Sequence, residues 1–165
     1  MATFIENYKI VPLGVDIDFS TAASNLSDSI NMKNYHRATF LIQLADIGTA
    51  SPVLQVYSGA TDAATTSSLD FRYAFGSAAA GSEDCDVLAD WTDVDAGDGL
   101  TLTHGTYDNY ILVVDVSASA MDLANNEEWL TLDFADADGG ATGQAIVIAV
   151  LEPRYAGNQS VTALE

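Results

Sequence analysis

The sequence offers few side chains for nucleophilic catalysis. Its only histidines are His36 and His104, and it has no Gly-x-Ser-x-Gly segment, the turn that exposes a serine nucleophile in α/β-hydrolases. The single cysteine, Cys85, lies between Asp84 and Asp86, whose negative charges disfavour the thiolate that a catalytic cysteine needs. Because no nucleophile is paired with a general base, we expect that the protein is not an enzyme.

One acidic segment has the composition of a cation-binding loop. Asp93, Asp95 and Asp98 alternate with small residues, and closely spaced carboxylates in a loop are ligands for a hard cation such as Ca²⁺. The segment departs from an EF-hand, because its glycines are out of register and no bidentate glutamate follows at the required spacing. Asp and Gly are also ordinary turn residues, so a plain turn and a Ca²⁺ loop both remain open. We expect no other cofactor.

Aromatic side chains on a β-protein can form a platform for sugars. Most aromatic residues here alternate in step with aliphatic residues, which favours packing into a core over display on the surface. A carbohydrate-binding module is therefore an alternative function. Its candidate platform residues are Tyr57, Tyr73, Trp91, Tyr107 and Trp129.

The charge balance excludes several classes of partner. The 165 residues include 24 acidic and 5 basic side chains, for a formal net charge of −19. Nucleic-acid binding and adhesion to anionic membranes both need a basic surface. No apolar run approaches the roughly 18–20 residues of a membrane-spanning helix. We therefore expect neither a nucleic acid nor a membrane as partner.

Alternating apolar and polar residues predict a chain made of short strands. The pattern is clearest at 38–47, 53–57, 69–75 and 129–135, and weaker strands are expected at 8–13, 16–19, 29–32, 87–91 and 100–103. Two further runs, 110–116 and 145–151, are apolar on both faces, which predicts central strands covered on both sides.

About eight to ten short strands separated by turn residues indicate an all-β fold. We expect a single-domain, jelly-roll-like β-sandwich over residues 1–152, followed by an irregular tail over residues 153–165. One or two helical turns are expected between Ser117 and Ala124, with Ser117 or Ser119 as the N-cap.

Four segments of the sequence share a pattern with a known group of proteins. A lysine-asparagine turn leads into a strand over Asn31–Ile42, and an apolar strand ends in Glu-Pro-Arg-Tyr within Ala149–Asn158. Together with Leu69–Tyr73 and Tyr110–Val116, these segments resemble small tailed-phage virion proteins, usually described as capsid decoration or auxiliary head proteins. The strong acidity of this chain departs from the pattern of that group.

The resemblance implies a viral structural protein on the capsid exterior of the virion. Its partner would be the major capsid protein, and the protein itself would be a homo-oligomer, with a trimer favoured. Arg154 and Tyr155 follow the last strand, and Arg and Tyr are frequent among interface hot spots, so we expect them to contact the partner. Another minor virion component, such as a tail protein or head-fibre base, is the alternative within the same particle.

Overall fold

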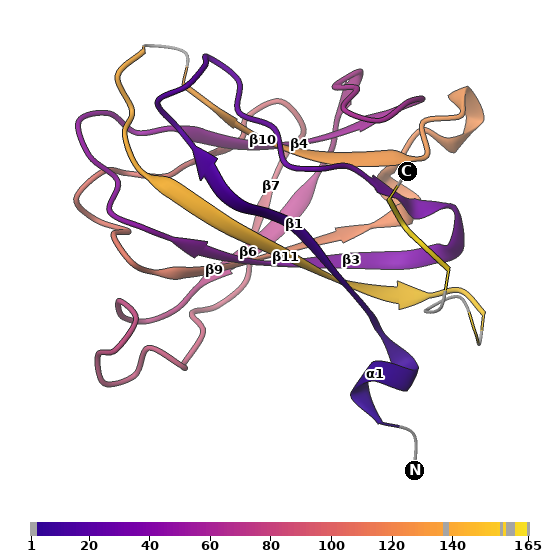
Figure 1. Ribbon diagram of the computed structural model, residues 1–165, viewed down its shortest axis with the longest axis horizontal. Helices are drawn as coiled ribbons and strands as arrows, with labels where there is room; N and C mark the ends of the chain where they lie inside the picture. Colours follow the sequence, from indigo (N-terminus) through magenta and orange to yellow (C-terminus); the bar gives the residue numbers. More distant parts are fainter. Residues whose placement is uncertain (1–2, 137–138, 156, 158–160, 165) are drawn as a thin grey trace.

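Strands form two antiparallel sheets that pack face to face (Figure 1). The computed structural model describes residues 3–136, 139–155, 157 and 161–164. The first sheet has the order β1 (Lys9–Asp18), β11 (Gln144–Pro153), β3 (Tyr35–Leu44), β9 (Ile111–Ser117), β6 (Phe71–Phe75) and β7 (Thr92–Val94). The second has the order β2 (Ile30–Asn31), β10 (Trp129–Ala135), β4 (Val53–Gly59) and β5 (Ser67–Ser68), and β8 (Leu100–Thr101) also pairs with β4.

The strand order is that of a jelly roll. The first and last strands, β1 and β11, are neighbours, and β11 lies between β1 and β3. The four strands β1, β11, β3 and β9 of one sheet face β2, β10, β4 and β8 of the other, which is the arrangement of two interleaved Greek keys. The short strand β5 is an addition beside β4, and β6 and β7 extend the first sheet beyond β9. The expected all-β, jelly-roll-like sandwich is confirmed, with eleven strands among the described residues.

The core follows from the alternation within the long strands. Ala38, Phe40, Ile42 and Leu44 of β3 point inward and are fully buried, as their period-two spacing predicts. From the opposite sheet, Phe134 of β10 points inward in the same way, and its ring stacks on that of Phe19, with 5.3 Å between ring centroids. Burying each large apolar side chain contributes about 1.5–3 kcal/mol, so this interior is the main source of stability.

Several element predictions differ from the structure. The two weak strands expected near the N-terminus form one strand, β1, with register shifts on either side of Gly14 that mark β-bulges. Residues 87–91 do not form a strand, and β7 follows them instead. The expected helical turns occur as the 3₁₀ turns η2 (Ala118–Ala120) and η3 (Leu123–Asn125), and Ser117 caps η2 by accepting a hydrogen bond from the Ser119 N–H.

The described segments near the two ends of the chain differ in how they contact the sandwich. A one-turn helix, α1 (Phe4–Asn7), precedes β1 and extends away from the two sheets (Figure 1). In the C-terminal tail, the described residues have no regular secondary structure, but Ala163 is buried and its carbonyl accepts a hydrogen bond from the Asn31 N–H. Among the described residues, no helix is long and apolar enough to cross a membrane.

The two doubly apolar runs have different surroundings. In β9, Val113 and Asp115 on the outer side are buried, so the prediction of a strand covered on both sides is confirmed. In β11 the prediction is wrong, because Ile146 and Ile148 point away from the core into solvent. The reason is that no other part of the described chain packs on this side of β11.

Candidate partner-binding surfaces

The residues considered for nucleophilic catalysis lie apart from one another. His36 is near the start of β3, His104 is in the loop after β8, and Cys85 is in the loop between β6 and β7. The His104 backbone N–H donates to the Ser51 hydroxyl, but in the described part of the chain none of these three side chains forms a hydrogen bond with another residue. That the protein is not an enzyme stays a prediction.

The acidic segment after Trp91 is a turn held by its own hydrogen bonds. Asp93 belongs to β7, and the Asp98 N–H donates to the Asp95 carbonyl over 3.2 Å. The Ala96 N–H donates to Oδ1 of Asp70 over 2.7 Å, which ties the turn to the start of β6. Within the described residues, no group of three or more His, Cys, Asp or Glu side chains could hold one metal ion. Of the two readings left open for Asp93, Asp95 and Asp98, the described geometry is that of the turn.

The aromatic candidates are divided between the two sheets, with Tyr57 and Trp129 half-buried on neighbouring strands of the second sheet and Tyr73 in the first. Tyr73 and Tyr107 pack against the core, and the Tyr107 ring stacks on Phe75 with 4.0 Å between centroids. Trp91 is 44% exposed, and the Arg72 guanidinium lies 4.7 Å from the centroid of its ring. The exposed indole is therefore held by a cation–π contact at the edge of the first sheet.

Asp115 is the centre of a charge cluster on the outer side of β9. Its Oδ2 accepts a hydrogen bond from Nε of Arg72 over 2.9 Å and forms an ion pair with Nη2 of the same side chain, also at 2.9 Å. Nε of Arg37 lies 3.7 Å from the same oxygen. Its Oδ1 accepts from the Thr39 hydroxyl at 2.9 Å. The cluster thus engages two of the five basic side chains and joins β3, β9 and β6.

Four of the five basic side chains lie at one end of the sandwich, which we call the basic end: Lys9, Lys33, Arg37 and Arg154. Antiparallel pairing brings them together, because it places the starts of β1 and β3 beside the end of β11. Lys9 is opposite Leu151, and Arg37 is opposite Glu152. None of the described carboxylates forms an ion pair with Lys9, Lys33 or Arg154.

A groove of about 490 Å³ opens at the basic end, between the end of β11 and the turns after β9. Arg154 is held in it, because its Nε donates to the Tyr35 carbonyl over 2.9 Å and its N–H donates to the Asn34 carbonyl over 2.8 Å. Tyr155 beside it is 73% exposed. The sequence analysis predicted Arg154 and Tyr155 as contact residues but not the neighbouring cations. Only the strand register shows that these cations lie beside Arg154 and Tyr155.

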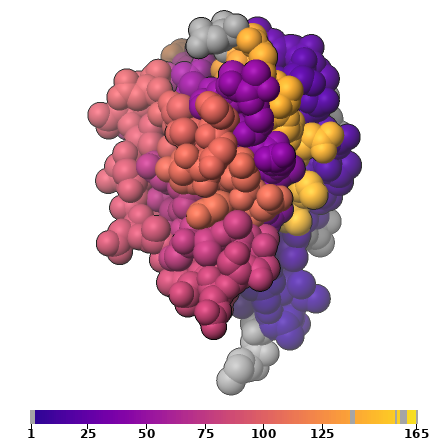
Figure 2. Space-filling model, turned by 90° about the vertical axis from the view of Figure 1, so that its left-hand side faces the viewer, coloured from indigo at the N-terminus to yellow at the C-terminus, as the bar shows by residue number. Residues whose placement is uncertain are grey.

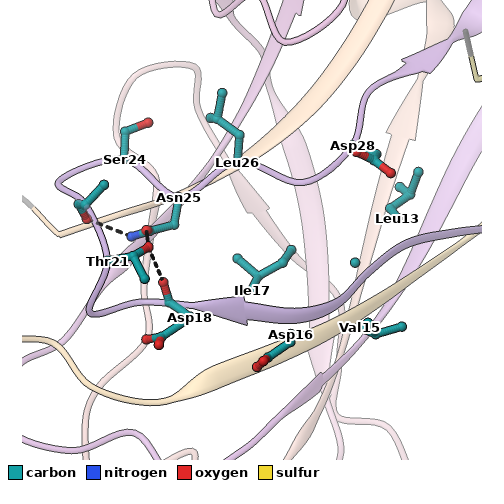
Figure 3. A pocket seen from close by; sticks show the side chains of 12 residues that line it. Leu13, Val15, Asp16, Ile17, Asp18, Thr21, Ser24, Asn25, Leu26 and Asp28 are labelled. Carbon is teal, nitrogen blue, oxygen red and sulfur yellow. Dashed lines mark hydrogen bonds between the residues drawn. The ribbon is translucent and has the colours of Figure 1, made fainter.

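The opposite end of the molecule is formed by loops. Figure 2 looks onto this end, with segments from the middle of the chain in front. A groove of about 470 Å³ lies between the bulged part of β1 and the loop that follows it (Figure 3). Its carboxylates are Asp16, Asp18 and Asp28, and hydrogen bonds from the Ser20 hydroxyl and N–H lower the pKa of Asp18. Val15 and Asp16 lie on the opposite side of β1 from Leu13 and Ile17 (Figure 3).

On the outer side of the second sheet, β10 carries the buried polar residues Thr131 and Asp133. The Ser29 and Thr131 hydroxyls are 2.7 Å apart, and the Asn25 N–H donates to Oδ1 of Asp133 over 3.1 Å. Burial raises the pKa of Asp133 above its usual value, although hydrogen bonds from Ser24 and Asn25 act in the opposite direction.

On β1, β11 and β3, the outer side of the first sheet is largely apolar and open, and we call this part the outer face. Its exposed residues lie on three adjacent strands, where Ile148 is opposite Leu41 on β3 and Pro12 on β1. Large apolar groups rarely cover one side of a sheet that faces water, and a contiguous apolar patch marks an interaction site. The large exposed side chains are Ile10 (47%), Ile146 (45%), Ile148 (36%) and Leu41 (36%).

Comparison of the chain with protein-family models, with curated proteins and with solved structures finds no match.

Proposed function

We propose that the protein is a structural component of a tailed-virus particle, a decoration protein that binds the outside of the head through its basic end. The observation that carries the proposal is the gathering of four of the five cations around Arg154 and Tyr155 on a chain with a net charge of −19. The cations at this end offer attachment points for an acidic partner surface, whereas the negative charge of the rest of the chain would repel one.

The positions of the segments that resemble decoration proteins also support the basic end as the docking surface. They correspond to the start of β3, the end of β11, β9 and β6, which are consecutive strands of the first sheet. The two more distinctive segments, Asn31–Ile42 and Ala149–Asn158, meet at the basic end, where Arg37 is opposite Glu152. Jelly rolls occur in viral capsid proteins as well as in lectins, so the fold adds only an analogy.

The local geometry suits a docking anchor. Two hydrogen bonds to backbone carbonyls fix the Arg154 backbone and guanidinium before any partner arrives, which lowers the entropy lost on binding. The exposed Tyr155 adds a rigid ring with a polar tip, the kind of group that dominates interface energies. Most of the remaining acidic side chains would then point away from the particle and keep particles dispersed.

The first test is to count this protein against the major capsid protein in gradient-purified particles of its source virus by quantitative mass spectrometry. Hundreds of copies per particle would support decoration. A few copies would replace decoration with a tail or head-fibre role, and absence from the particle would overturn the proposal.

The second test measures cosedimentation with particles that lack the protein. Lys33 and Tyr155 are exposed, so the double variant Lys33→Glu, Tyr155→Ala is expected to fold normally and to bind at least about tenfold more weakly. The matched control is Thr103→Glu, Thr106→Glu, which makes the same change in net charge in the loop after β8. Equal binding by the two variants would show that the basic end is not the docking site.

Carbohydrate binding is the second candidate function, and the exposed indole of Trp91, held over Arg72, is the observation that favours it. A glycan array would test it directly. Binding that disappears in Trp91→Ala would favour this role, and absence of any glycan binding would exclude it.

A further inference from the structure

We propose that the groove at the basic end binds a carboxylate side chain from an acidic segment of a protein partner. The inference rests on the function proposed above, because it names the chemical group that the docking end would hold.

The groove of about 490 Å³ is built from the ends of three neighbouring strands. Arg37 lies in the middle, directly opposite Glu152 of β11 on one side and Ser117 of β9 on the other. Arg154 follows β11, Ser119 lies in the turn after β9, and both also line the groove. Because side chains directly opposite one another on adjacent strands lie close together, a single ligand group in the groove can contact all three strand ends.

A β-bulge brings two consecutive side chains of β3 to the groove. The pairing of β11 with β3 shifts between Glu152 and Pro153, and His36 is the residue of β3 that is left out of the pairing. In a regular strand, His36 and Arg37 would point to opposite sides of the sheet. Here both are exposed and both line the groove, because a bulge redirects the side chains of its strand. The bulge therefore places an imidazole beside the guanidinium group.

The two guanidinium groups in the groove retain donors for a ligand. Asp115 is held mainly by Arg72, two of whose nitrogen atoms lie 2.9 Å from Oδ2, whereas Nε of Arg37 is 3.7 Å away. Nε of Arg154 donates to a backbone carbonyl of β3. In the described part of the chain, no hydrogen bond or ion pair engages the Nη atoms of Arg37 or Arg154, and Glu152 forms no ion pair. These planar N–H groups match the two oxygens of a carboxylate.

The charges in the groove favour a carboxylate over a phosphate. Arg37 and Arg154 supply two positive charges, and Glu152 supplies one negative charge. A singly charged carboxylate balances this set. A phosphate monoester carries about −1.5 to −2 at pH 7 and would be repelled more strongly by Glu152 and by the rest of the acidic chain. Leu123 also lines the groove and is 42% exposed, so it can contact the methylene groups of a bound Asp or Glu side chain.

The first test titrates the full chain with a capped tetraglutamate peptide at fixed ionic strength and follows the backbone amides by heteronuclear NMR. We expect saturable shifts at Arg37 and Ser119, no saturable shifts with tetraglutamine, and weaker binding of inorganic phosphate. Absence of saturable shifts with tetraglutamate, or shifts confined to another part of the molecule, would overturn the proposal. Phosphate binding at least as tight as peptide binding would overturn the choice of a carboxylate.

Two pairs of variants test the groove itself. Glu152→Gln removes the competing carboxylate and is expected to tighten peptide binding about three- to tenfold. Glu83→Gln, the same change in the exposed loop between β6 and β7, should alter it by less than about twofold. Ser119→Glu adds a carboxylate in the groove and should weaken binding about tenfold, whereas Ser82→Glu in the same exposed loop should not. Equal effects within either pair would overturn the groove as the binding site.

Cosedimentation with virus particles separates this inference from the function on which it rests. If the unmodified protein binds tetraglutamate through the groove but does not bind particles, the proposed function is wrong and the carboxylate site stands. If the protein binds particles, and Glu152→Gln and Ser119→Glu bind them as tightly as the unmodified protein does, the function stands and the groove is not the contact.

Discussion

Replacing Asp115 by Asn tests whether charge holds the outer side of β9. The carboxylate is buried, accepts one hydrogen bond from Nε of Arg72 and one from the Thr39 hydroxyl, and forms an ion pair with Nη2 of Arg72. Asn keeps the size and shape of the side chain but removes its charge. Hydrogen bonds to charged groups contribute about 1.5–3 kcal/mol each, and water recovers part of this at Arg72, whose side chain is 42% exposed.

The expected loss for Asp115→Asn is about 2 kcal/mol in the free energy of unfolding, or about 4–8 °C in Tm for a chain of this length. The sign of the change in the free energy of unfolding distinguishes two explanations. At a net charge of −19, general repulsion predicts the opposite result, because removing any one negative charge should slightly stabilise the folded state. Asp86→Asn is the matched control, since Asp86 is exposed in the loop between β6 and β7.

The assay is urea unfolding followed by circular dichroism and by tryptophan fluorescence. Because Trp91 lies against the Arg72 guanidinium, release of Arg72 should also change the native fluorescence of Asp115→Asn but not of Asp86→Asn. Equal stability of Asp115→Asn and the unmodified protein, or equal shifts in the two variants, would show that the cluster contributes no specific stability.

Three further perturbations test other parts of the structure. Burial raises the pKa of Asp133 in the folded state above 3.8, so the folded protein loses stability as pH rises through that pKa and the buried carboxyl becomes charged. Asp133→Asn should therefore raise the urea midpoint near neutral pH. Below pH 3.8, where the carboxyl is already neutral, the substitution should have no effect. A lower midpoint at neutral pH would contradict this. Gly143→Ala should lower the free energy of unfolding by at least about 2 kcal/mol, because φ is +124° and a Cβ would collide with the Asp46 carbonyl. Gly105 also has a positive φ but open space around it, so Gly105→Ala should lower the free energy of unfolding less in the same urea experiment. Adding EDTA at fixed ionic strength should leave Tm unchanged, and a large fall would restore the Ca²⁺ loop.

The strands were predictable because their pattern is local. Alternation along 129–135 depends only on which neighbouring side chains are apolar, and β10 spans the predicted residues. The same holds for the inward-facing residues of β3 and for the Ser117 cap of η2. The short 3₁₀ turns and the bulges of β1 were harder to predict from the sequence. A shift of register changes the pairing between strands but hardly changes the residue pattern of one strand alone.

Side-chain alternation and turn residues, which act over a few neighbours, were enough to predict the all-β class, the main strands and the inward-facing residues of strands such as β3 and β10. Which strands are neighbours became visible only in the folded chain. That pairing brings Lys9, Arg37 and Arg154 to one end, although they are distant in the chain. It also leaves the outer side of Ile148 open, although its strand reads as apolar on both faces. The physical reason is that register and burial depend on contacts between residues far apart in sequence, which no local pattern encodes.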